Sequence, residues 1–111
     1  MLTTDRTEKK VLMNNINKVI IINSIIENEL RIRAYGVKSL ALFGSFSKNE
    51  FEENSDVDFL VNLNKATNRN YSGLKSFLES SFERKIDLVC ENSLDERINI
   101  YILKDALWLV N

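Results

Sequence analysis

The alternation of apolar and polar positions along the chain predicts three buried strands and a short fourth one. Residues 37–43 are apolar at all but two positions, which is typical of a buried strand, whereas residues 57–63 and 85–90 largely alternate between apolar and polar side chains. A period of two places successive side chains on opposite faces of a sheet. We therefore expect strands at these three positions and a short edge strand at residues 107–110.

Apolar positions at helical spacing predict three helices around these strands. A capping pair of acidic residues opens a first helix, which we expect over residues 5–35 with Gly36 as its stop. The other two helices are expected over residues 71–84 and from residue 93 to about residue 106. The predicted order of elements is therefore α-β-β-α-β-α.

The first helix is apolar on more than one side. The apolar stripe expected to face the sheet consists of residues 12, 16, 19, 26 and 30. Further apolar positions lie off this stripe, at residues 11, 21, 25 and 32. Such a helix is expected to be covered by more than its own sheet. One alternative stays open, in which the β-branched run at residues 19–22 breaks the helix.

Composition restricts the chemistry that is available. The 111 residues fit a single domain, residues 1–111, and the net charge of -1 argues against a protein that coats nucleic acid. The absence of His and the single Cys exclude Ser-His-Asp and Cys-His catalysis and a structural zinc site. Without a signal-like start or an apolar run long enough for a bilayer, a cytoplasmic setting is expected. Any enzymatic chemistry must then use carboxylates, hydroxyls, Lys or Arg, with a hard metal ion.

Three carboxylates are predicted to meet on one face of the sheet. Asp56 and Asp58 are two positions apart and share a face, and Asp87 lies opposite the apolar face of the third strand. At roughly 7 Å and an effective dielectric near 20, each pair repels by about 2 kcal/mol, which a Mg²⁺ ion would offset. As alternatives, Asp56 is an ordinary turn residue, and Asp58 and Asp87 are polar positions on a solvated face.

A glycine-serine pair follows the first strand directly. Gly44 allows a sharp turn and a close approach of the backbone to a ligand, and the Ser45 hydroxyl can add a hydrogen bond to a phosphate. Lys48 is placed to offer a positive charge to the same phosphates. Taken alone, the pair is also typical of an ordinary turn, and Lys48 of a solvated surface charge.

The ordered set of Gly44-Ser45, ten residues, and Asp56-Val57-Asp58 resembles the signature of the nucleotidyltransferase (polymerase-β-like) superfamily. The small size of the chain points to the minimal nucleotidyltransferase (MNT) branch. The likeness extends from the first helix to residues 102–106, and Asp87 supports it.

The resemblance implies an α+β fold in which a small mixed β-sheet packs on helices. It implies that Asp56, Asp58 and Asp87 hold Mg²⁺, that Asp87 helps to activate an acceptor hydroxyl, and that Gly44 and Ser45 bind the nucleotide triphosphate. The implied reaction moves AMP from ATP to a hydroxyl and releases pyrophosphate. Minimal proteins of this kind are commonly antitoxins that adenylylate a tyrosine of a partner HEPN-domain ribonuclease toxin.

The sequence departs from the family pattern in the loop after Gly44-Ser45. Lys48 stands where Arg is usual, Asn49 stands where Gly is usual, and Phe46 is bulkier than the residue often found there. Asn tolerates left-handed backbone angles better than most residues, whereas Lys lacks the planar fork of Arg. We therefore expect the turn to survive and phosphate binding to be weaker.

Two other functions remain alternatives. In one, the protein neutralises a partner by direct binding through the first helix and residues 107–110, with a site that is vestigial or only binds nucleotide. In the other, it modifies a small molecule, although such enzymes usually carry an additional helical domain. With 111 residues there is little room for the acceptor half of an active site. We therefore expect the protein to act on, or with, a protein partner, and we expect no direct contact with nucleic acid or membrane.

Overall fold

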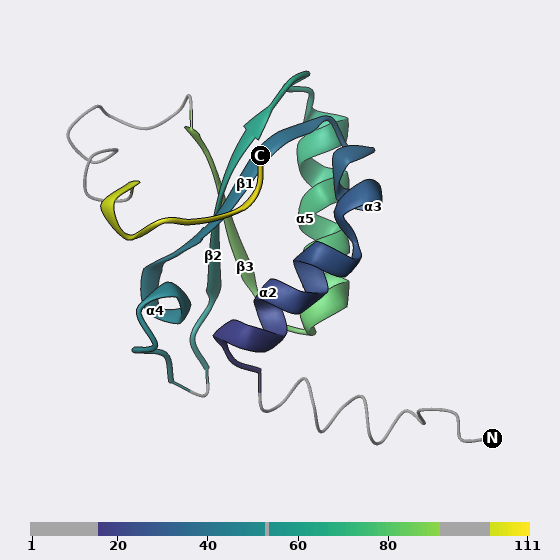
Figure 1. Ribbon diagram of the computed structural model, residues 1–111. Coiled ribbons are helices and arrows are strands. Elements are labelled where there is room, and N and C mark those ends of the chain that lie inside the picture. The colour runs from purple at the N-terminus through teal and green to yellow at the C-terminus, as the bar shows by residue number, and fades with distance from the viewer. Residues whose placement is uncertain (1–15, 53, 92–102) are drawn as a thin grey trace.

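Four strands form one mixed sheet at the centre of the molecule (Figure 1). The computed structural model describes residues 16–52, 54–91 and 103–111. In sheet order, the strands are β3 (Ile86–Cys90), β2 (Val57–Leu63), β1 (Val37–Phe43) and β4 (Leu107–Val110). β1 is antiparallel to β2 and β4, whereas β2 and β3 are parallel. The strands predicted from alternation are confirmed, including the edge strand β4.

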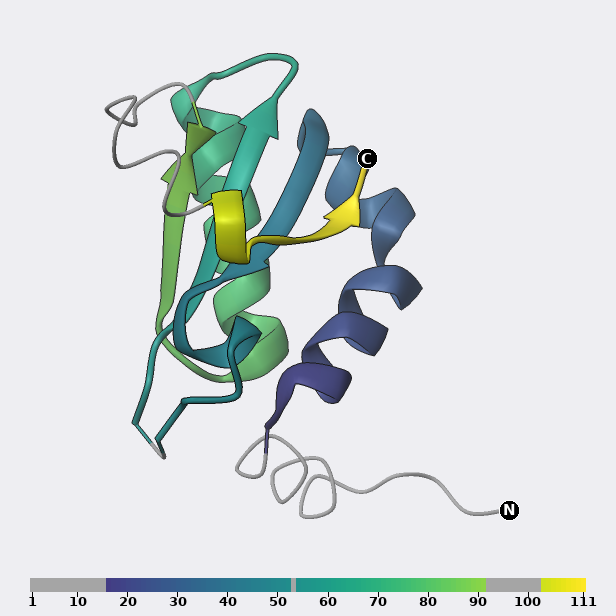
Figure 2. The same cartoon turned by 60° about the vertical axis from the view of Figure 1, so that its left-hand side comes forward.

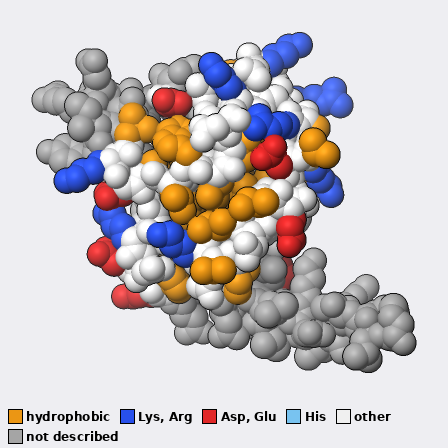
Figure 3. All heavy atoms as spheres, in the orientation of Figure 1, with side chains coloured by type: hydrophobic (Ala, Val, Ile, Leu, Met, Phe, Trp, Pro, Cys, Tyr) orange, Lys and Arg blue, Asp and Glu red, His pale blue; other side chains and the backbone are white. Residues whose placement is uncertain are grey.

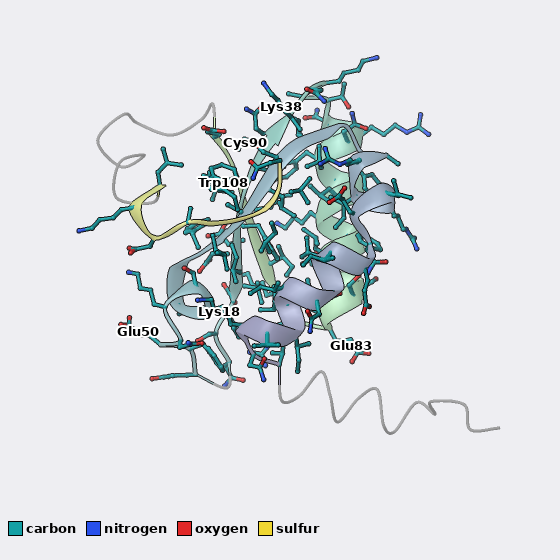
Figure 4. The ribbon with its side chains drawn as sticks, viewed as in Figure 1. Lys18, Lys38, Glu50, Glu83, Cys90 and Trp108 are labelled. Atoms are coloured by element: carbon teal, nitrogen blue, oxygen red, sulfur yellow. The ribbon has the colours of Figure 1, made fainter. Side chains whose placement is uncertain are left out.

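The longer helices cover one face of this sheet (Figures 1 and 2). They are α2 (Lys18–Glu27), α3 (Glu29–Arg33) and α5 (Asn68–Phe82). α5 begins three residues before the predicted start because the Thr67 hydroxyl caps it and accepts a hydrogen bond from the Asn70 amide at 3.1 Å. It ends where Glu83, labelled at the foot of this helix in Figure 4, takes a left-handed backbone conformation.

The expectation of one continuous first helix is wrong within the described residues. Asn17 has an extended backbone, and its side chain accepts a hydrogen bond from the Ile20 amide at 3.0 Å, so α2 begins at Lys18. Asn28 then ends α2, and a short second helix, α3, follows it. The alternative of an extended break at residues 19–22 is also wrong, because these residues are helical. The predicted start at residue 5 lies outside the described residues, whereas the stop at Gly36 is confirmed by its φ of +80°.

The apolar face that α2 and α3 turn toward the sheet is not the predicted one. Ile21, Ile25 and Ile32 are buried, although they lie off the predicted stripe. The exposed large hydrophobic side chains on these helices, Val19, Ile26 and Leu30, are 63%, 57% and 85% accessible. Residues 21, 25 and 32 also recur at helical spacing, so the sequence offered two candidate faces and only packing selected one. The expectation that more than the sheet covers this helix stays a prediction, because Val19, Ile26 and Leu30 are exposed in the isolated chain.

The face of the sheet opposite the helices carries the polar side chains. Strand register places Phe43, Asp58 and Asp87 in one row across β1, β2 and β3. The next row contains Ala41 and Leu60, both fully buried. Paired residues on neighbouring strands project from the same face, so this register decides which functional groups can meet.

The last predicted helix lies mostly outside the described residues. Residues 103–105 form a helical turn that leads into β4, whereas residues 92–102 are not described. In the part of the chain that the structure covers, no helix has the length and apolarity to cross a membrane.

Figure 3 shows apolar side chains gathered near the centre of the face that carries β4.

The choice of helix face can be tested by substitution. We expect Ile25→Ala to lower the free energy of unfolding by about 2–4 kcal/mol, because it empties a buried position between α2 and the sheet. Leu30→Ser should change it by less than about 0.5 kcal/mol, because this side chain is exposed. Urea unfolding monitored by circular dichroism provides both values, and equal losses would show that the described helix face is incorrect.

Candidate active site

Two of the three predicted carboxylates meet on the face opposite the helices. Asp58, on the inner strand β2, is the register partner of Asp87 on the edge strand β3, and their carboxyl groups are within hydrogen-bonding distance of each other. Asp58 is half-buried, whereas Asp87 is exposed. The parallel register therefore creates a carboxylate pair with one shielded and one accessible member.

The surroundings of Asp58 favour its protonated form. Its pKa is raised from 3.8 to about 6, mostly by burial and then by the negative charges of Asp87 and Asp56. The hydrogen bond to Asp87 adds to the effect because a protonated carboxyl can donate to its neighbour. The site therefore concentrates negative charge at a position where solvent does not fully screen it.

Asp56 lies beside this pair and has a partner of its own. Its Oδ2 atom is 3.9 Å from Lys85 Nζ, and the side chains of Asp56 and Lys85 are 41% and 77% accessible. Among the described residues, no group of three His, Cys, Asp or Glu side chains is close enough together to hold a metal ion. The structure thus assembles Asp58 and Asp87 as a pair, with Asp56 acting on Asp58 through its charge.

The chemistry of these groups nevertheless suits a divalent cation. Carboxylate oxygens are the ligands that Mg²⁺ prefers, and a cation would offset the repulsion that raises the pKa of Asp58. A bound Mg²⁺ ion would supply charge stabilisation to a reacting phosphate group.

Gly44 brings the backbone of the next segment directly against Asp58. It has a φ of +72°, and a Cβ atom added at this position would overlap the Asp58 carboxylate. Gly44 also begins the single-turn helix α4 (Gly44–Ser47). The Ser45 hydroxyl makes no hydrogen bond within the described part of the chain. The backbone carbonyl of Ser45 accepts a hydrogen bond from the Glu50 amide at 2.8 Å. The glycine-serine turn and the carboxylates therefore form one continuous site.

Lys48 has a partner that the sequence did not indicate. Its Nζ atom is 3.4 Å from Asp105 Oδ2, and the Ser47 hydroxyl donates to the Asp105 carbonyl at 2.5 Å. These contacts join α4 to the turn before β4. Because both charged groups are about 40% accessible, the ion pair is weak, and its two members remain accessible to other partners.

Two of the departures from the family pattern have structural explanations. Asn49 has a φ of 59°, the left-handed conformation expected where glycine is usual. Phe46 is fully buried and stacks on Phe51, with ring centroids 4.3 Å apart and an angle of 10° between the rings. Phe46 therefore anchors α4 in the protein interior.

Sequence reasoning missed one arginine at the site. Arg84 precedes β3, and its Nη1 atom donates to the carbonyl of Ser55 at 3.1 Å, while its guanidinium carbon lies 5.5 Å from the centre of the Phe46 ring. No periodic pattern marks this position, since both contacts are made with segments distant in the sequence.

The fold and this site together define a protein of the nucleotidyl-transfer class: a small mixed sheet with a glycine-serine turn packed against paired carboxylates. Residues 24–109 match the model of the nucleotidyltransferase domain family. The chain is 32% identical over 84 residues to the protein adenylyltransferase MntA of Thermococcus cleftensis, covering 75% of this chain and 84% of that one.

Solved structures agree with this match. A protein designated a minimal nucleotidyltransferase superimposes with a TM-score of 0.71 at 28% identity, covering 83% of this chain and 95% of that one. A mutant of a toxin–antitoxin complex containing MntA superimposes with a TM-score of 0.62 at 26% identity, covering 78% and 69% of the two chains. The chain belongs to the nucleotidyltransferase domain family, so the resemblance noted from its motifs and the expected α+β fold are confirmed.

The raised pKa of Asp58 predicts a pH-dependent stability. The Asp58 carboxyl binds its proton more tightly in the folded state than in the unfolded state, and this difference stabilises the fold. The stabilisation is complete below about pH 4 and is lost as the pH rises through about 6. Without divalent metal, we expect the free energy of unfolding to fall by about 1–2 kcal/mol between pH 5 and pH 7, a value reduced for solvent screening. Asp58→Asn should flatten this dependence in urea titrations with a chelator, whereas an unchanged slope would contradict the assignment.

The contact between Gly44 and Asp58 predicts a steric penalty. We expect Gly44→Ala to lower the free energy of unfolding by about 1–3 kcal/mol, because the new Cβ overlaps the carboxylate and the positive φ is strained. In an Asp58→Ser background the overlap with the carboxylate is absent, so the cost should shrink to the backbone strain alone. An equal cost in both backgrounds would show that the two groups do not touch.

Proposed function

We propose that this protein is a magnesium-dependent adenylyltransferase that moves AMP from ATP to a hydroxyl of a partner protein and acts as the antitoxin of a HEPN-type toxin. The observation that carries the proposal is the packing of the Gly44 turn directly on Asp58, with Asp87 beside it. A backbone turn suited to phosphates and carboxylates suited to Mg²⁺ are thus parts of one site.

In the proposed reaction, the acceptor hydroxyl oxygen forms a bond to the α-phosphorus of ATP while the bond to the leaving pyrophosphate breaks. Asp58 and Asp87 would hold Mg²⁺ as a pair, with Asp56 joining them by turning away from Lys85, and the ion would stabilise charge on the phosphates. Asp87 is the exposed member of the pair, so an acceptor hydroxyl can reach it, and its carboxylate would take the hydroxyl proton. Gly44 and Ser45 would contact the triphosphate, with Lys48 exchanging Asp105 for phosphate oxygens.

The comparisons support a protein as the acceptor. The Thermococcus cleftensis relative carries the name protein adenylyltransferase, and one similar structure was solved as a toxin–antitoxin complex. The partner would then supply the acceptor group, and a tyrosine hydroxyl is the acceptor implied by the family.

A second function, neutralisation by direct binding, is favoured by a separate observation. Val19, Ile26 and Leu30 form an exposed apolar stripe on α2 and α3, which is a surface suited to contact with another protein. In this case the carboxylates would be dispensable for the antitoxin effect.

Transfer of a label from α-labelled ATP to the cognate toxin separates the two functions. We expect the Asp56→Ala/Asp58→Ala variant to lose at least about 100-fold in transfer rate, because it removes the groups that hold Mg²⁺ against the phosphates. Glu79→Ala, at an acidic residue on α5 away from the carboxylates and from the exposed stripe, is the matched control and should retain the wild-type rate.

The same variants are then tested for neutralisation of the toxin in cells. If the double variant still neutralises the toxin fully, direct binding is the relevant function. If the wild-type protein transfers no more label than the double variant, the transferase proposal is wrong.

A further inference from the structure

The junction between α5 and β3 contacts both halves of the site. Residues 83–85 form this junction, which turns at Glu83 through a left-handed backbone conformation. From it, Arg84 reaches α4 on one side and the segment before β2 on the other. These two segments carry the predicted phosphate-binding turn and the first predicted metal ligand, respectively.

Asp56 is held by this junction through the residues on either side of it. The carbonyl of Ser55, one position before, accepts a hydrogen bond from Arg84 Nη1 at 3.1 Å. The amide of Val57, one position after, donates to the carbonyl of Lys85 at 3.1 Å. These two hydrogen bonds hold the backbone on both sides of Asp56, from which its side chain projects.

The other contact of Arg84 fixes α4. Its guanidinium group lies over the ring of Phe46, which is fully buried and stacked on Phe51. A planar guanidinium can lie over an aromatic ring and still donate from its edge, which an ammonium group cannot do in the same way. A single side chain therefore bridges the helix that begins at Gly44 and the backbone that carries Asp56.

We propose that Arg84 is a positioning residue that sets the spacing between the Gly44-Ser45 turn and Asp56. This inference rests on the proposed function, because it assigns Arg84 to the binding of a nucleotide together with its metal. Arg84 does not need to touch the nucleotide. Its loss would let the two halves of the site move relative to each other, and small misplacements of binding groups are costly.

The test compares Arg84→Ala and Arg84→Lys with a matched control, Arg69→Ala. Arg69 is an exposed arginine near the start of α5 and lies outside the site. Binding of AMP-PNP with Mg²⁺ is measured by calorimetry below the unfolding temperature of every variant. We expect Arg84→Ala to weaken binding about tenfold, Arg84→Lys to recover part of this loss, and Arg69→Ala to bind as the wild type does.

Amide hydrogen exchange gives a second readout that needs neither transfer nor a toxin. We expect the amides of Ser55 and Val57 to exchange at least about tenfold faster in Arg84→Ala than in Arg69→Ala. If Arg84→Ala is too unstable to purify, Arg84→Lys is compared with Arg69→Lys in the same two assays. Equal exchange at these amides, or equal nucleotide affinity, in the Arg84 and Arg69 variants overturns the proposal.

The outcomes keep this inference apart from the proposed function. A wild-type protein that binds AMP-PNP but transfers no AMP contradicts the transferase function, while the comparison of variants still decides the role of Arg84. If the wild type binds no nucleotide, the positioning role in binding is wrong as well, whatever the exchange rates are.

Discussion

The register of the inner strand β2 is the constraint on which the site depends. Its pairing with β3 places Asp58 beside Asp87, and its pairing with β1 places Phe43, the last residue of β1, opposite the same Asp58. The chain therefore turns right beside the Asp58 carboxylate after β1 ends. Only glycine fits at position 44, because a Cβ atom there would overlap this carboxylate. A shift of one residue in either pairing would move Asp58 to the helix-covered face, where an uncompensated charge is costly.

The strands and the carboxylate pair could be predicted because both depend on a period of two. Alternation identified residues 57–63 and the polar face of that strand, and a parallel neighbour then sufficed to bring Asp87 close to Asp58. The helical face could not be predicted in the same way. The segment carries two apolar faces at helical spacing, and the break at Asn28 depends on side-chain and backbone contacts that periodicity does not register.

The contacts between distant segments were equally inaccessible from the sequence. Nothing in the apolar and polar pattern pairs Lys48 with Asp105 or Arg84 with Ser55. The residues of each pair are far apart in the sequence, and only the tertiary fold brings them together. The loop after the glycine-serine pair shows the reverse case. Asn49 was expected to preserve the turn from its backbone preference alone, and its left-handed conformation agrees with that local argument.

The two candidate functions use different surfaces, so they are compatible. α2 and α3 cover one face of the sheet (Figures 1 and 2), and these helices carry the exposed side chains of Val19, Ile26 and Leu30. Asp58 and Asp87 alternate with buried residues along β2 and β3, so they lie on the opposite face. A partner that docks on the stripe leaves the immediate surroundings of Asp58 and Asp87 uncovered. Docking on the helical side would keep a partner close while its acceptor group samples the carboxylate face. Under this arrangement, the loss of catalysis need not abolish binding, and the loss of the stripe would weaken both.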